Sequence, residues 1–114
     1  MQPNIIVQFK GTVYENGYGQ IAQRVMRDRR LHRNAKVIYA YLCSYAGGNV
    51  LDPKWAWPTV SLMMDDLGFK KEETFYKYRK ELIDYGYITV EQFRDGKGKF
   101  TRNLYNIELQ PQPK

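Results

Sequence analysis

The sequence predicts an α+β domain in which three helices are followed by a two-stranded β-hairpin. Two adjacent segments, 60–67 and 72–85, carry apolar residues three or four apart, the spacing of the buried stripe on a helix. Gly68 lies between them, where a glycine commonly ends a helix. From Tyr87 onward apolar residues alternate with polar ones, as in half-buried strands, and a basic, glycine-containing stretch at 94–99 separates the two strands.

Positive charge is concentrated in two segments of the chain. The 114 residues form one domain with room for a single modest core, and the net charge is +6. Six basic residues against Asp28 give segment 24–36 a net charge of +5, and four against Asp95 give segment 94–102 a net charge of +3. The remainder sums to −2. Nucleic acid is the expected partner, although many soluble proteins are basic without binding a polyanion.

The cysteine and histidine content excludes several functions. With Cys43 as the only cysteine and His32 as the only histidine, the chain can form neither an intramolecular disulfide nor a zinc cluster. A catalytic cysteine also needs a base and an orienting group, so Cys43 is interpreted as a buried, inert thiol. The chain has no apolar run near the ~20 residues that span a bilayer. We expect a cytoplasmic protein that does not contact membranes, is not an enzyme, and has no catalytic residue, metal or cofactor.

Three regions are expected along the chain: an N-terminal strand and loop at 1–19, the main domain at 20–109, and a linker-like tail at 110–114. The apolar run at 4–9 predicts a short strand, which either pairs with a second chain or folds back on its own domain. Residues 20–26 alternate loosely and are interpreted as extended. The proline-bearing tail suggests that a further domain follows.

Helix boundaries are predicted from capping residues and glycines. The first helix is expected to begin near Asn34, a common N-cap residue, and to end at the glycine pair 47–48. Thr59 caps the second helix, and Phe69 in the following turn is expected to fill the core. The third helix ends before Gly86. The expected core positions of the helices and hairpin are Ala35, Ile38, Tyr39, Leu42, Cys43, Ala46, Leu62, Met63, Leu67, Phe75, Tyr78, Leu82, Ile83, Tyr85, Ile88, Val90, Tyr105, Ile107 and Leu109.

Five short motifs, in this order, carry a family resemblance. They are NAKVIYAYL at 34–42, WPTVS at 57–61, DLG at 66–68, TFYKYRKEL at 74–82 and YGYI at 85–88. Together they resemble the winged helix-turn-helix domains of bacterial plasmid and phage replication proteins. The resemblance implies that the hairpin is a wing and that double-stranded DNA is the partner.

In that family the second helix of the motif enters the major groove, and the wing contacts phosphates or the minor groove. The resemblance implies DNA-binding roles for side chains of the turn, the helix and the wing, namely Lys70, Lys71, Thr74, Tyr76, Lys77, Lys80, Arg94, Lys97, Lys99 and Arg102. The basic segment before the first helix adds Arg29, Arg30 and Arg33. An alternative for these arginines is pairing with Asp65, Asp66 or a partner chain. An alternative for the helix lysines is a solvated face without a partner.

Two acids at the start of the third helix depart from the family pattern. Glu72 and Glu73 lie where related domains often have basic or hydroxyl residues, and the turn before them is one residue longer. A glutamate can accept a hydrogen bond from cytosine N4. The interpretation we favour is that both acids only offset the positive end of the helix dipole, each by roughly 0.3–1 kcal/mol. Since segment 72–85 has a net charge of −1, the wing and segment 24–36 are expected to dominate phosphate affinity.

Several functions are compatible with such a domain, because one fold serves many roles. The first hypothesis is recognition of repeated sites at a plasmid or phage replication origin, by a homodimer or together with replication proteins. The second is a role in conjugative transfer, as a relaxosome accessory protein, or in transcription. The third is a protein-docking module in which the acidic helix contacts a protein partner instead of DNA.

Overall fold

The computed structural model describes residues 19–46 and 58–108. Within these ranges four helices precede an antiparallel hairpin, which confirms the predicted α+β winged-helix fold. The predicted strand at 4–9, the glycines at 47–48 and the tail at 110–114 lie outside the described residues. The elements are α1 (Gln23–Met26), α2 (Arg33–Ala46), α3 (Val60–Leu67), α4 (Glu72–Asp84), β1 (Ile88–Arg94) and β2 (Phe100–Ile107).

The hydrophobic core is built around α2. Ile38 of α2, Met63 of α3, Phe75 and Leu82 of α4, and Ile88 of β1 are all completely buried. Each of these elements therefore contributes at least one fully buried side chain to the same cluster. Truncating such a side chain to alanine typically costs about 2–5 kcal/mol, so this cluster fixes how α4 and the hairpin are held against α2.

The caps of α3 follow the sequence prediction. Thr59 Oγ1 accepts a 3.0 Å hydrogen bond from the Leu62 backbone N–H, and Gly68 ends the helix with a φ of 82°. The placement of Leu62 in the core was wrong, because its side chain is 42% exposed. The neighbouring Met63 takes the core position, and successive residues of a helix point about 100° apart.

Two predictions for the chain up to the start of α2 were also wrong. Helix α2 begins at Arg33, and the Nδ1 atom of His32 accepts a 3.0 Å hydrogen bond from the Asn34 N–H, so His32 provides the cap that was assigned to Asn34. Residues 20–26 are not extended throughout, because they contain α1. This single turn is anchored by Val25, which is 3% exposed. A helix of one turn is too short for hydrophobic periodicity to detect.

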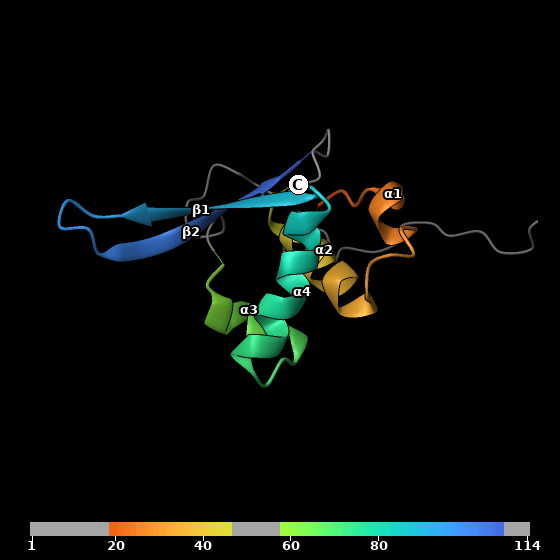
Figure 1. Ribbon diagram of the computed structural model, residues 1–114, viewed down its shortest axis with the longest axis horizontal. Coiled ribbons are helices and arrows are strands. Elements are labelled where there is room, and N and C mark those ends of the chain that lie inside the picture. The colour runs from red at the N-terminus through yellow and green to blue at the C-terminus, as the bar shows by residue number, and fades with distance from the viewer. Residues whose placement is uncertain (1–18, 47–57, 109–114) are drawn as a thin grey trace, which may run out of the picture.

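The hairpin lies across one end of the helices. Its inner face carries Ile88, Val90, Tyr105 and Ile107, as the alternation predicted, and the strands pair Ile88 with Ile107 and Val90 with Tyr105. From Glu91 onward every residue of β1 is exposed. Figure 1 shows the turn of the hairpin projecting well away from the helices, with α1 on the opposite side of the molecule. The wing is thus held at its base, and its tip projects away from the helices.

Cys43 is 1% exposed, and burial raises the pKa of its thiol, in agreement with an inert core cysteine.

Within 19–46 and 58–108, no helix is long and apolar enough to cross a membrane, and no three potential metal ligands lie together.

Candidate nucleic-acid interface

The turn between α3 and α4 is fixed by an aromatic contact. Phe69 is half-buried, and its ring meets that of Phe75 edge to face, with 5.7 Å between centroids. The left-handed conformation of Gly68 directs the chain back so that the Phe69 N–H reaches the Met64 carbonyl at 2.9 Å. Phe69 fills the core as predicted, and the lysines that follow it are consequently presented on the surface.

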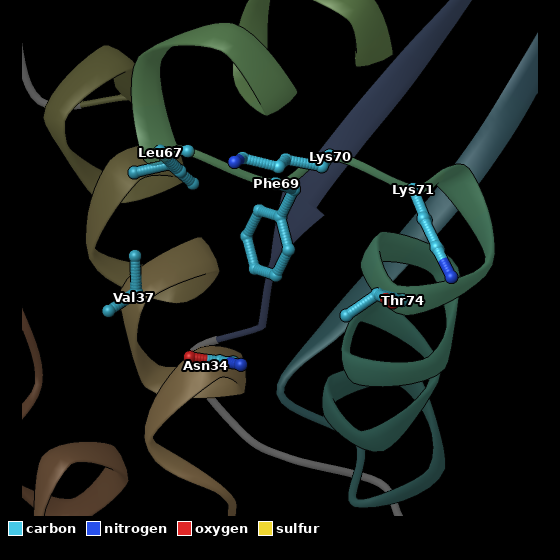
Figure 2. A pocket seen from close by; sticks show the side chains of 8 residues that line it. Asn34, Val37, Leu67, Phe69, Lys70, Lys71 and Thr74 are labelled. Atoms are coloured by element: carbon cyan, nitrogen blue, oxygen red, sulfur yellow. The ribbon is translucent and has the colours of Figure 1, made fainter.

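A hollow of about 500 Å³ lies between this turn and the first half of α2. Figure 2 shows the Phe69 ring between α2 and α4, with Lys70 and Lys71 on the turn above it. The structure thus brings together three predicted site residues, Lys70, Lys71 and Thr74, and adds Asn34, which the sequence analysis treated only as a cap. The hollow is lined by Asn34, Val37, Leu67, Gly68, Phe69, Lys70, Lys71 and Thr74.

The outer face of α4 carries no net charge. Glu73, Lys77, Lys80 and Asp84 follow one another along it at intervals of three or four residues. Lys80 forms an ion pair with Asp84, and the Lys77 ammonium lies 5.2 Å from the centre of the Tyr78 ring. Both lysines are exposed, as predicted, but their charges are balanced by the two acids of the same face.

The side of α4 that faces the wing carries an aromatic and cationic cluster. Tyr76 is 40% exposed, and the Arg79 guanidinium lies 4.6 Å from the centre of its ring. Arg79 also donates a 3.0 Å hydrogen bond to the Tyr105 hydroxyl of β2. Sequence reasoning missed Arg79, although its position three residues after Tyr76 places both side chains on one side of the helix.

The wing tip, residues 94–99, is shaped by Asp95. Its Oδ1 accepts hydrogen bonds from the backbone N–H groups of Lys97 and Lys99, at 2.8 and 2.9 Å. Arg94 donates to the Gly98 carbonyl, so part of its hydrogen-bonding capacity is used within the tip. Arg94, Lys97 and Lys99 are exposed. The backbone of Arg102 lies in β2 opposite Phe93, while its side chain lies outside what the structure describes.

The exposed side chain of Arg30 is paired with Asp28 and packs on Tyr85. Its side chain donates two hydrogen bonds to Asp28, at 2.9 and 2.6 Å, and its guanidinium lies 4.2 Å from the centre of the Tyr85 ring. This guanidinium holds the pKa of the Asp28 carboxyl well below its usual range. The alternative pairing with Asp66 was wrong for Arg30, and Asp66 instead accepts a 2.7 Å hydrogen bond from the Tyr41 hydroxyl.

Arg29 and Arg33 are the other two candidate arginines of this segment. Arg29 and Arg33 are exposed, and Arg33 is the first residue of α2, next to Asn34 at the hollow. Apart from Lys77 and Lys80 of α4, the exposed cations among the candidate site residues fall into three groups: those at or just before the start of α2, those of the turn before α4, and those of the wing tip. Between the second and third groups lies the outer face of α4, which carries no net charge.

Comparison with known proteins identifies one family. No curated protein and no solved structure matches the chain. A family model described as a helix-turn-helix domain matches residues 29–88, which is more than half of the 114 residues and runs from Arg29 to the first residue of the wing. The chain therefore belongs to the helix-turn-helix domain family, and it is a DNA-binding domain of the winged type.

Proposed function

We propose that this domain recognises repeated duplex sites at the replication origin of a plasmid or phage, with α4 in the major groove and the wing on the backbone. The observation that carries the DNA geometry is the distribution of charge around α4. Lys70 and Lys71 precede the helix, and Lys97 and Lys99 lie at the wing tip, while the outer face between them has no net charge. Phosphate contacts position a protein and base contacts specify the site. Cations on both sides of a polar helix face without net charge suit that division, because the cations can contact phosphates and the helix face can contact bases.

The hollow beside α4 supports a phosphate contact at the start of the helix. Its polar side chains are the Asn34 amide, the Thr74 hydroxyl and the ammonium groups of Lys70 and Lys71, and all four can donate hydrogen bonds. A backbone phosphate accepts several such bonds at once, and those from ammonium groups are charge-assisted. We therefore add Asn34 to the candidate DNA contacts.

Within the segment before α2 we assign DNA contact to Arg29 and Arg33 ahead of Arg30. The Arg30 charge is already paired with Asp28, so a phosphate would gain less from it. Arg33 lies one residue before Asn34, which places its cation on the helix turn that borders the hollow. Tyr76 of α4 and Arg102 of the wing remain candidates in the proposed interface.

The origin-binding role rests on the resemblance of the five motifs to plasmid and phage replication proteins. Conjugative transfer and transcription use the same kind of duplex contact, and the identity of the bound site separates them. A homodimer on repeated or inverted sites is part of the proposal, because half-site spacing then mirrors the symmetry of the protein.

The test is duplex binding measured by fluorescence anisotropy at several salt concentrations. The probes are duplexes from the DNA that flanks the gene, with scrambled duplexes as controls. The proposal expects site-selective binding with a steep dependence on salt, because each neutralised phosphate releases counterions. Lys97→Ala/Lys99→Ala should reduce the salt slope by about 1.8, since the slope changes by about 0.9 per phosphate contact.

A second double variant locates the base contacts. Lys77→Ala/Lys80→Ala should narrow the preference for the specific duplex over the scrambled one more than the wing variant does. Equal binding to specific and scrambled duplexes by the unaltered protein, at low as well as physiological salt, would reject the proposal. If neither double variant loses its selectivity for the specific duplex, the surface that reads the bases does not lie on α4.

A further inference from the structure

We infer that Arg79, through Tyr105, is a positioning residue that sets the angle of the wing to α4 so that both contact one duplex. This inference rests on the proposed duplex binding and adds a residue that the family resemblance does not assign. Arg79 lies on α4 and Tyr105 on β2, and their side chains are hydrogen-bonded at 3.0 Å. The contact therefore joins the helix proposed for the major groove to the element proposed for the backbone.

The Arg79 guanidinium lies between two aromatic rings. Its central carbon is 4.6 Å from the centre of the Tyr76 ring and 6.0 Å from that of Tyr105. A guanidinium is flat and stacks on rings while its N–H groups donate in a fixed plane, whereas an ammonium on a flexible chain offers no plane. Tyr76, Arg79 and Tyr105 thus form a continuous contact, here called the joint, that links α4 to β2.

Within residues 19–46 and 58–108, the apolar packing of the wing's inner face on the body ends beside this joint. The pairs Ile88 with Ile107 and Val90 with Tyr105 belong to the core or pack against it. The next inner pair toward the tip is Gln92 with Asn103, which is polar and is not part of that cluster. Among the described residues, the apolar contacts that orient the wing on the body therefore lie at Tyr105 or closer to the base, while the Asn103 side-chain oxygen is also buried.

A small change of angle at the joint becomes large at the tip. From Tyr105 to Lys99 the strand is six residues long, about 20 Å at about 3.3 Å per residue. A tilt of about 10° at Tyr105 would move the tip by roughly 3 Å over that length. Hydrogen bonds between an ammonium and a phosphate oxygen are about 2.7–2.9 Å long, so such a shift is enough to break them. Holding the wing angle is thus a requirement for contacts made by Lys97 and Lys99.

The decisive variant is Tyr105→Phe, which removes the acceptor of Arg79 and keeps the ring. A double-mutant cycle with Lys97→Ala/Lys99→Ala measures whether the joint and the tip act together. The readouts are duplex affinity and its salt slope by anisotropy, with urea unfolding of each variant to exclude a loss of folded protein. Tyr45→Phe is the matched control, because it removes a half-buried tyrosine hydroxyl from α2, where it contacts Tyr41.

The expected result is coupling. Tyr105→Phe should weaken duplex binding about three- to tenfold, the factor that corresponds to the loss of one ordinary intramolecular hydrogen bond. It should also lower the salt slope toward that of the wing double variant, and it should have little further effect once Lys97 and Lys99 are gone. Tyr45→Phe should leave affinity and salt slope unchanged.

Three outcomes would overturn the inference. If the effects of Tyr105→Phe and of the wing variant are additive, the joint does not act through the tip. If Arg79→Lys binds like the unaltered protein, Arg79 is a simple cation that contacts phosphate directly. If the unaltered protein binds no duplex selectively, the proposed function fails, and the inference fails with it. If the unaltered protein binds its site and the effects of the two variants are additive, the role of the joint is rejected and the proposed function stands.

Discussion

The Tyr87 hydroxyl donates a 2.6 Å hydrogen bond to Asp28, and this contact ties the segment before α2 to the residue that precedes the wing. The two residues are 59 positions apart in the sequence. Tyr87 is buried, and Arg30 completes the arrangement by donating to the same carboxylate and stacking on Tyr85. The base of the wing is therefore held from two sides, by α4 through Arg79 and by the preceding segment through Asp28.

The Asp28 carboxylate should make stability depend on acid pH. Its pKa is well below the ordinary 3.8, chiefly because the Arg30 side chain donates to it. A carboxyl group with a lowered pKa in the folded state stabilises fully above its unfolded pKa, and that contribution is lost as the pH falls below it. The free energy of unfolding of the unaltered protein minus that of Asp28→Asn should be constant from about pH 7 to 5 and should shrink from about pH 4 to 2.

Urea unfolding at a series of pH values measures this difference. Asp65→Asn, a change at an exposed carboxylate of α3, corrects for the general effect of removing one acid. A difference between the unaltered protein and Asp28→Asn that is the same at pH 2.5 as at pH 7 would show that the charge of Asp28 does not stabilise the fold.

His32 should contribute to stability as the cap of α2. Its Nδ1 atom accepts the Asn34 N–H at 3.0 Å, and its ring stacks on Tyr78 with 4.5 Å between centroids. His32→Ala should lower the free energy of unfolding by about 1 kcal/mol through the lost cap, with a further loss from the stacked ring. His32→Asn should recover the cap and not the stacking. Thermal unfolding of the three proteins separates the two contributions, and equal melting of all three would exclude a capping role.

Gly19 should tolerate no side chain. A Cβ atom built there would lie 1.6 Å from the carbonyl oxygen of Cys43, which is backbone and cannot move aside as a side chain would. Gly19→Ala is expected to lower the free energy of unfolding by about 1–3 kcal/mol or more, because overpacking typically costs this amount. Gly96→Ala is the matched control, because a Cβ at Gly96 meets nothing within 4 Å. Urea midpoints of the two variants test this, and equal midpoints would mean that the chain before α1 does not pack on α2.

The sequence was sufficient for the elements whose signals are local. Thr59 and Gly68 mark the ends of α3 through their own side-chain and backbone chemistry, and the alternation of apolar residues indicated that Val90 and Tyr105 face the core. The partner of Arg79 could not be predicted from local signals. Arg79 meets Tyr105, 26 positions away, and such a contact depends on how α4 packs against the hairpin.

Other misses have a different physical origin. His32 was not predicted as a cap because Asn34, two residues later, is the more common capping residue type. The hollow beside α4 has no sequence signal, since Asn34 and Thr74 meet there only when α2 and α4 pack together. The site residues named from the resemblance, from Lys70 to Lys99, are exposed or line this hollow, and whether they contact DNA is the question for the binding experiments.

Asp95→Asn should strengthen duplex binding. The Asp95 carboxylate shapes the wing tip by accepting from the N–H groups of Lys97 and Lys99 through one oxygen, and an asparagine oxygen can accept both bonds. The substitution removes a negative charge from the proposed phosphate contact, so affinity at low salt should rise about two- to fivefold, with a smaller gain at high salt because salt screens the charge. Asp95→Ala should not give this gain, since it also releases the tip. Unchanged affinity for Asp95→Asn would place the wing tip away from DNA.

Glu73→Gln should decide between the two interpretations of the acids at the start of α4. Glu73 is exposed in the first turn, where a negative charge offsets the helix dipole by about 0.3–1 kcal/mol. If that is its only role, the variant should be less stable by this amount in urea and should bind specific and scrambled duplexes more tightly by the same factor, because one repulsive charge is gone. If Glu73 accepts from a cytosine N4, the variant should lose discrimination at one C·G pair while other positions keep theirs.

Glu72→Gln provides the matched control, since it removes the same charge from the preceding position of the same helix turn. A scan of single base-pair changes in the bound duplex distinguishes these results, and we expect the uniform gain for both variants.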